Sequence, residues 1–322
     1  MSTKANLQIG ISFHSFTHEY CSFIWSFEDL MEKAAQLGGG VEIVGPTHHR
    51  GFPEVGDEFE RSFKSAVQRY GLTPTSYGSY ADPFMLSDRN LTDDELVDYT
   101  IPQIKGASKL GFPVVRLQYF THTIVERLLP YAQKYNLKLG YELHQPLTIE
   151  SDETQMLKRQ VERISSEHLG LIPDCGIFAR SVPKFMIERA RRGGVSEAII
   201  ARALALWADK VPLDKSLVEL QALGLEDSKI TAVEGFWGSV GQSDPQALRT
   251  IMPYIVHMHG KFFSMENGDE PDVRFEEVVH ALLAGGYRGW ISSEFEGDAP
   301  NSLEMVMAHQ AMLRRYVASY AA

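Results

Sequence analysis

The sequence repeats one pattern along most of its length: an amphipathic segment, then a Gly or Asn, then a short apolar segment. The first full repeat has a predicted helix at 27–37, glycines at 38–40 and a predicted strand at 41–44. Similar pairs of helix and strand are predicted at 59–70 and 74–80, 93–110 and 114–119, 124–135 and 137–143, 150–167 and 169–173, and 274–283 and 290–295. Gly or Asn just past the last helical residue is typical of helix C-termini. Helices that alternate with strands favour a parallel sheet built from right-handed βαβ units.

Two more apolar segments, at 7–13 and 254–259, bring the predicted strands to eight, and a last helix is predicted at 301–320. Eight strands that alternate with helices are what a closed (β/α)8 barrel requires. An open, doubly wound sheet is the competing architecture. No glycine-rich dinucleotide or phosphate loop follows a predicted strand, because the glycines at 38–40 precede one. We therefore predict an α/β fold, a single TIM barrel domain over residues 1–322.

One interval is too long for a single βα unit. About 80 residues separate the predicted sixth and seventh strands, roughly twice the usual spacing. The excess contains helical patterns at 183–192 and 195–207. We predict a helical insertion at about 178–235 on the C-terminal face of the barrel, which could act as a lid, a subunit contact or a packed decoration.

Composition excludes several classes of protein. The net charge of −11 and the pI near 5.5 argue against nucleic acids or anionic membranes as partners, since both attract basic surfaces. Two cysteines, Cys21 and Cys175, cannot form a disulfide scaffold and indicate a reducing compartment. The N-terminus has no secretory signal pattern, and no apolar run is long enough to span a membrane. We expect a cytoplasmic protein.

Polar side chains interrupt four of the apolar strands near their ends: Glu142, Asp174, His259 and Glu294. Functional residues of a barrel lie where its strands end, so these four should converge. Carboxylates with one imidazole suit a divalent ion, with Mn²⁺ favoured and Mg²⁺, Co²⁺ or Zn²⁺ also compatible. A single Glu at such a position more often binds a backbone N–H or an Arg, but four on successive strands indicate a metal site.

The surrounding motifs are YELH at 141–144, PDCG at 173–176, HMHGK at 257–261 and SSEFE at 292–296. Together they resemble the sugar phosphate isomerase/epimerase family of xylose-isomerase-like TIM barrels, over almost the whole chain apart from the insertion. The resemblance implies the same four metal ligands, Glu142, Asp174, His259 and Glu294. It also implies that the two Glu residues move protons, as they often do in the ketose 3-epimerases.

The chain departs from those epimerases at two substrate-contacting positions, where Ile177 replaces a His and Met265 replaces an Arg. It has His144 instead, on the same side of the strand as Glu142. This strand, the insertion and the SEFE ending most resemble the large (alpha) subunit of bacterial C-glycoside deglycosidases. That resemblance implies a metal-dependent lyase for 3-oxo-C-glucosides of plant phenolics, and a small β-rich partner subunit in a hetero-oligomer.

The implied chemistry begins at a carbonyl group. A metal ion near the 3-oxo oxygen would acidify the C2–H, a base would take that proton, and the aglycone would leave C1 by elimination. Two other functions share the first step: a sugar isomerase or epimerase, and a keto-inositol dehydratase. A barrel that binds a sugar without turnover is an alternative of a different class.

The remaining candidates are weaker. His144 is either a general base or a hydrogen-bonded histidine behind the ligands. His14 could touch substrate, and so could the pair at 48–49, although loop histidines are more often simply exposed. Arg116, Gln118 and Lys261 complete the predicted substrate-binding residues, with a core ion pair as the alternative for Arg116 and a solvated or Asp-paired state for Lys261. Cys175 is expected to serve packing.

Overall fold

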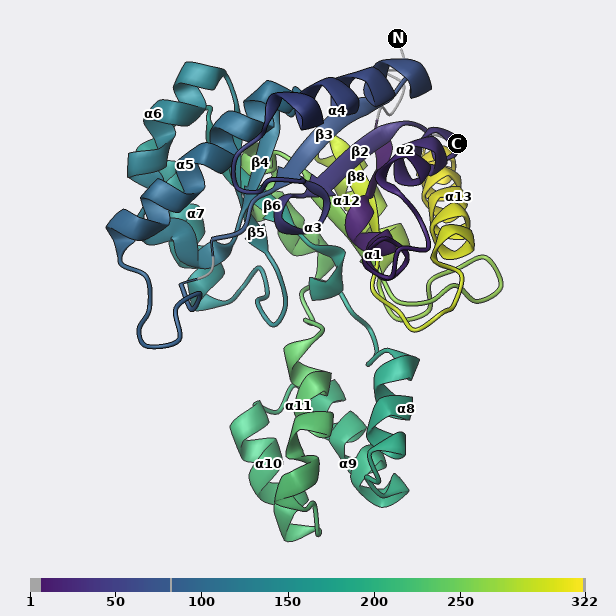
Figure 1. The fold of residues 1–322 in the computed structure, drawn as a ribbon. Helices are drawn as coiled ribbons and strands as arrows, with labels where there is room; N and C mark the ends of the chain where they lie inside the picture. The colour runs from purple at the N-terminus through teal and green to yellow at the C-terminus, as the bar shows by residue number, and fades with distance from the viewer. Residues whose placement is uncertain (1–6, 82, 321–322) are drawn as a thin grey trace.

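The protein is an eight-stranded parallel barrel, described here from a computed structural model that covers residues 7–81 and 83–320 (Figure 1). The hydrogen-bonded strand order is β6-β5-β4-β3-β2-β1-β8-β7. Isolated parallel bridges, Leu171 to Ile255 and Asp174 to His259, join the two ends of this order and bring the barrel to closure. The strands are β1 (Gln8–Ser12), β2 (Gly40–Val44), β3 (Thr73–Gly78), β4 (Val114–Leu117), β5 (Lys138–Leu143), β6 (Leu169–Pro173), β7 (Met258–Phe262) and β8 (Trp290–Phe295). The predicted fold class is confirmed.

The helices around the barrel begin and end where the local sequence directs them. Ser26 and Thr92 each form a capping box with the acidic residue three positions later, which starts two of these helices. Gly71, Gly111 and Asn136 end three of them in the left-handed conformation that a helix C-terminus favours. The helices are α1 (Thr17–Cys21), α2 (Phe27–Gln36), α3 (Gly45–His48), α4 (Asp57–Tyr70), α5 (Asp93–Leu110), α6 (Val125–Tyr135), α7 (Asp152–Ile164), α12 (Phe275–Ala284) and α13 (Ser302–Tyr320).

One predicted strand is displaced. The seventh was expected at 254–259, but residues 252–254 form a 3-10 turn and β7 starts at Met258. Pro253 has no N–H to donate to a neighbouring strand, so regular pairing cannot begin there. The shift matters for the site, because it places His259 near the start of β7 and Lys261 near its end.

The insertion contains four helices within the described residues, where the sequence pattern predicted two. They are α8 (Lys184–Arg192), α9 (Glu197–Ala208), α10 (Leu213–Ala222) and α11 (Ile230–Gly238). Figure 1 shows them as a group that projects away from the barrel. The weak helical signal of α11 has a physical cause, because Gly235 and Gly238 lower its intrinsic helix propensity. Burial of Val233 and Phe236 supplies stability that the local sequence lacks.

Among residues 7–81 and 83–320, no helix combines the length and the apolar character that crossing a bilayer requires.

Candidate metal centre and active site

The four predicted metal ligands lie together on four neighbouring strands, three of them at strand ends and His259 near the start of β7. Glu142 belongs to β5, Asp174 follows β6, His259 belongs to β7 and Glu294 to β8. All four are buried, and each offers one ligand atom within 4.8 Å of the others. The isolated bridge between Asp174 and His259 is the contact that brings the two halves of this group together. We call these four residues the carboxylate cluster.

Some carboxylate oxygens of the cluster accept a hydrogen bond from the protein, and at least one does not. His259 Nδ1 donates to Glu142 Oε1 at 2.6 Å and lies 3.5 Å from Glu294 Oε2. Asp174 Oδ1 accepts from the backbone N–H of Gly176 at 2.6 Å. Asp174 Oδ2 is buried without a hydrogen-bond donor, although the ammonium group of Lys261 lies 3.4 Å away. A buried carboxylate oxygen of this kind is costly unless a cation or donor reaches it.

The two glutamates of the carboxylate cluster differ in the direction in which their pKa values are shifted. Burial disfavours ionisation of Glu142, but Arg116 and His259 outweigh it and hold the pKa of that carboxyl well below its usual value. Burial raises the pKa of Glu294, and His259 offsets this only in part. Burial also opposes the charged form of His259, but the carboxylates around it raise its pKa well above 6.5. One carboxylate is therefore firmly ionised and the other is the more basic of the two.

The carboxylate cluster fits a divalent metal ion. Three carboxylates and one imidazole are donors that Mn²⁺, Mg²⁺, Co²⁺ and Zn²⁺ all accept. Donor atoms about 2.1 Å from a common ion lie roughly 3–4 Å from one another, so small side-chain movements would bring these atoms into range. Asp174 Oδ2, which has no hydrogen-bond donor and only the more distant ammonium of Lys261, is the oxygen that such an ion would satisfy.

A second group of charged side chains lies beside the first, and we call it the lysine cluster. Lys261 is fully buried, and its Nζ lies 2.9 Å from Glu296 Oε1 and 2.8 Å from His144 Nε2. His14 Nε2 contacts the same oxygen of Glu296 at 3.2 Å. Burial disfavours the charged forms, yet the mutual attraction lowers the pKa of Glu296 and raises the pKa of Lys261. The paired state expected as the alternative for Lys261 is the one found.

His144 uses both ring nitrogens within the protein. Nδ1 bonds the carbonyl oxygen of Gln145 at 2.8 Å, and Nε2 faces Lys261. The imidazole is therefore held in one orientation, with its lone pair directed at an ammonium group. To accept a proton from a substrate, Nε2 would have to release Lys261, which Glu296 is placed to retain.

Of the other predicted side chains, one contacts the carboxylate cluster and the others bond to the surrounding barrel and loops. Arg116 Nη1 lies 3.4 Å from Glu142 Oε2, the core ion pair that was weighed as its alternative role. Gln118 Oε1 accepts from the backbone N–H of Ala81, which fixes the loop after β3. The expectation of exposed loop histidines at 48 and 49 is wrong, because both are buried. His49 bonds Tyr77 and the carbonyl of Glu54, while His48 accepts from the N–H of Val44.

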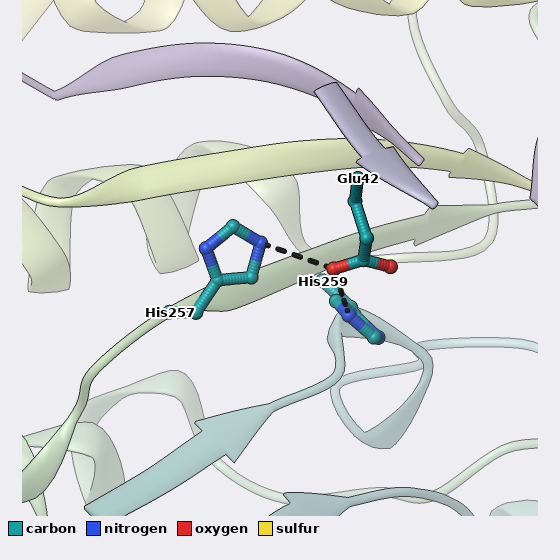
Figure 2. Close-up of side chains that lie close together, drawn as sticks. All are labelled: Glu42, His257 and His259. Carbon is teal, nitrogen blue, oxygen red and sulfur yellow. Dashed lines mark hydrogen bonds and ion pairs between the residues drawn. The ribbon is translucent and has the colours of Figure 1, made fainter. Parts of the chain in front are cut away.

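Two features of the site were not predicted. Glu42 lies in the middle of β2, completely buried, and its Oε2 is 3.0 Å from His259 Nε2 (Figure 2). Glu296 is the anion of the lysine cluster. Each had a sequence signal: Glu42 interrupts an apolar strand at its centre, and Glu296 follows Glu294 at a spacing that points both side chains the same way.

Two cavities adjoin these clusters. The smaller, about 320 Å³, is lined by Glu142, Glu294, Arg116 and Gln118 among others. The larger, about 760 Å³, lies between the barrel and the insertion, with Phe185, Met186 and Arg189 of α8 in its lining. Both cavities share a boundary formed by His14, His144 and Glu296. The predicted residues His14 and His144 thus lie where the two spaces meet.

Comparison with known proteins agrees with this architecture. The 3'-dehydrocarminate deglycosidase alpha subunit of Microbacterium sp is 34% identical, over 98% of this chain and 97% of its own length. A C-glycoside deglycosidase alpha subunit of Microbacterium trichothecenolyticum is also 34% identical, over 89% of this chain and 83% of its own.

Solved structures share the fold at lower identity. The 3-keto-D-glucoside 4-epimerase from E. coli superposes with a TM-score of 0.57 at 12% identity, over 96% of this chain and 99% of that one. No protein family model matches the chain. The barrel, its matched length and the identity to the two Microbacterium proteins together place this chain in the family of C-glycoside deglycosidase alpha subunits.

Proposed function

We propose that this chain is the catalytic subunit of a C-glycoside deglycosidase, a divalent-metal-dependent lyase that cleaves 3-oxo-C-glycosides of phenolic aglycones. The observation that carries the proposal is the pairing of a carboxylate cluster in one cavity with a larger cavity directly beside it. The names of the related alpha subunits support the same substrate class.

The two volumes favour a glycoside over a free sugar. A space of about 320 Å³ is sufficient for a single sugar ring, and the typical range for ligand pockets begins near 300 Å³. A free ketose would leave the neighbouring 760 Å³ unused. A glycoside would place its sugar by the carboxylate cluster and its aglycone in the larger cavity, with the bond between them near His14 and His144.

The larger cavity suits a flat aromatic group. Phe263 and Phe295 line it from the barrel, and Phe185 of α8 faces Phe263 with 5.9 Å between ring centroids. Aromatic rings of a ligand gain from edge or offset contacts with such side chains. Arg189 adds a positive charge to the lining, which would favour an aglycone with a carboxylate or an ionised phenol.

The proposed reaction needs one base and one acid. When bound, a divalent ion would withdraw electron density from the 3-oxo oxygen and acidify the C2–H. Glu294 would take the C2 proton, because its raised pKa makes it the better base of the two glutamates. The C2–H electron pair forms the C1=C2 double bond, and the C1–aglycone bond breaks with its electrons on the aglycone carbon.

The aglycone carbon then takes up a proton, so the products balance the substrate. His14 and His144 both line the two cavities, and His14 is our proposed proton donor at this point. His144 would serve only by passing on a proton from Lys261, because its own N–H is bound to the Gln145 carbonyl. For His14, the contact with Glu296 outweighs burial and raises the pKa, so that the imidazole is more often protonated than usual. Arg116, which pairs with Glu142, would keep that ligand ionised throughout.

A partner subunit belongs to the proposal. The relatives are named alpha subunits, and we infer that this chain likewise assembles with a second, beta-type subunit. Activity assays should therefore include the chain alone and together with a co-encoded small protein.

Mass spectrometry of products formed in D₂O tests the function. The Mn²⁺-loaded chain, with and without its small partner, is incubated with a 3-oxo-C-glucoside and separately with a panel of ketoses. We expect free aglycone that carries deuterium at the carbon formerly bonded to C1. Epimerised or deuterated ketose without aglycone release would replace the lyase with an isomerase, and water loss from a keto-inositol would indicate a dehydratase. An unchanged mixture in every sample would favour a binding protein.

A further inference from the structure

Glu42 lies in β2, lines neither cavity and touches the carboxylate cluster through His259. Its side chain is completely buried, and Ser12 Oγ donates to its Oε1 at 2.9 Å. Its Oε2 lies 3.0 Å from His259 Nε2 and 3.5 Å from His257 Nε2. Figure 2 shows both imidazoles directed at this one carboxylate. A carboxylate has no hydrogen to give, so the proton in the short contact belongs to His259.

The two nitrogens of His259 therefore face different surroundings. Nε2 points down to Glu42, while Nδ1 points up to Glu142 and Glu294. A neutral imidazole carries one proton, and the partner that binds it fixes which nitrogen keeps a free lone pair. Without a metal ion Nδ1 carries a proton as well, which it donates to Glu142. A bound ion would replace that proton, and with Nε2–H committed to Glu42 the lone pair would then lie on Nδ1, the nitrogen within reach of the other cluster ligands.

Glu42, His257 and His259 also lie close enough to form a metal site of their own. His259 belongs to both groups, so one ion can use it while the other nitrogen keeps its proton. The lower group has fewer free donor atoms, since Ser12 occupies Glu42 Oε1 and Ser292 Oγ lies 3.0 Å from His257 Nε2. Neither Glu42 nor His257 lines the two cavities through which an ion or substrate would enter.

We propose that Glu42 is a positioning residue: it holds His259 in the Nε2–H tautomer and aims Nδ1 at the metal ion, without binding that ion itself. The inference rests on the proposed metal dependence and adds a residue to it. Carboxylate partners of this kind raise the basicity of a ligating imidazole and fix its ring plane. Their loss typically reduces metal affinity about 10- to 100-fold.

Glu42→Gln is the sharpest variant, because it keeps size and shape. The Gln amide can donate to Nε2, which would move the imidazole proton to Nδ1 and turn it toward the ligands of the ion. Glu42→Asp keeps the charge but withdraws it by one methylene, so partial function should return. His257→Gln is the matched control: it changes a buried neighbour of Glu42 that is not a member of the carboxylate cluster.

The readout is Co²⁺ binding, titrated by its d–d absorption, with stoichiometry from elemental analysis and folding checked by circular dichroism. We expect one ion per chain in the unaltered protein, a dissociation constant raised about 10- to 100-fold in Glu42→Gln, a smaller rise in Glu42→Asp, and a change below about threefold in His257→Gln. In the Zn²⁺ form, ¹⁵N NMR of His259 should show the proton on Nε2.

Other outcomes overturn the inference in recognisable ways. If Glu42→Gln binds Co²⁺ as tightly as the unaltered chain, Glu42 has no positioning role. If His257→Gln loses the ion while Glu142→Gln retains it, Glu42 is a ligand and the ion lies in the lower group. If the unaltered chain binds no ion, the proposed metal-dependent function is wrong, and the positioning role of Glu42 is wrong with it. Should Glu42→Gln not fold, Glu42→Asp decides: unchanged affinity with a proton on Nδ1 would contradict the role.

Discussion

The carboxylate cluster and the lysine cluster lie side by side at the mouth of one barrel, yet they balance charge differently. The lysine cluster contains its own cation: Lys261 lies between Glu296 and His144, and His14 approaches from outside. The carboxylate cluster has three acidic groups around a single imidazole, and Asp174 keeps an oxygen without a donor. Lys261 is fully buried, but His14 and Glu296 are partly exposed, so water reaches the outer part of the lysine cluster and not the carboxylate cluster.

The contrast separates charges that are already paired within the protein from charges that a metal ion would pair. A buried group whose charges are already paired gains little from an added ion. A buried group with unpaired carboxylates stays costly until a cation arrives. The variants below are chosen to break this contrast or to sharpen it.

Removing a ligand from the carboxylate cluster should have the largest effect. Glu142→Gln loses the ionised oxygen that His259 and Arg116 both contact. We expect metal affinity to fall at least about 100-fold and aglycone release about 1000-fold or more. His259→Ala should lower metal affinity and aglycone release to a similar extent. Glu276→Gln, an exposed change on α12, is the control for elemental analysis and product assays. Stoichiometric metal in both ligand variants would remove the site assignment.

His144→Ala should separate turnover from metal binding. His144 is not a member of the carboxylate cluster but lines both cavities. We expect metal content to stay at one ion per chain while kcat falls about 100-fold, the usual scale for loss of an acid or base. Steady-state kinetics with elemental analysis measures both, and His280→Ala on α12 is the control. An unchanged kcat would reduce His144 to a scaffold residue.

Lys261→Met should harm the fold more than the metal site. It removes a buried cation, so that Asp174 loses its ion-pair contact and Glu296 keeps only His14. We expect the free energy of unfolding to fall by about 3 kcal/mol in urea titrations. Lys184→Met breaks an exposed pair with Glu266, and the change should stay below about 1 kcal/mol. Equal losses would mean that burial does not distinguish the two lysines.

Glu294→Gln should stabilise the metal-free protein against unfolding, whereas Lys261→Met destabilises it. Burial raises the pKa of Glu294 in the folded state, so ionisation at higher pH destabilises the fold. The variant should be more stable than the unaltered chain near pH 8, and the gain should shrink as the pH falls to the ordinary carboxyl range. Urea titrations in a chelator measure this, and Glu296→Gln, which breaks a pair with Lys261, should instead lose stability.

Glu142, Asp174 and Glu294 could be predicted because successive parallel strands place their C-terminal residues together. His259 was also found, although the predicted strand at 254–259 is displaced and His259 lies near the start of β7. The lysine cluster was harder to predict. Its contacts depend on side-chain directions: Lys261 could have turned to solvent, and His144 could have faced the substrate. Glu42 was not predicted as a site residue, because it lies at the middle of its strand and not near the end. The tilt of barrel strands brings a mid-strand residue of β2 beneath His259 on the far side of the barrel.

The links between α8 and the barrel bear on how a bulky molecule enters. Lys184 pairs with Glu266 and Arg192 with Asp298, and all four side chains are largely exposed to water. Exposed pairs contribute up to about 1 kcal/mol each and weaken as salt is added. Higher ionic strength should therefore weaken these two links, leave the packing of Phe185 on Phe263 in place, and change the passage of large aglycones past the insertion more than the buried chemistry of the barrel.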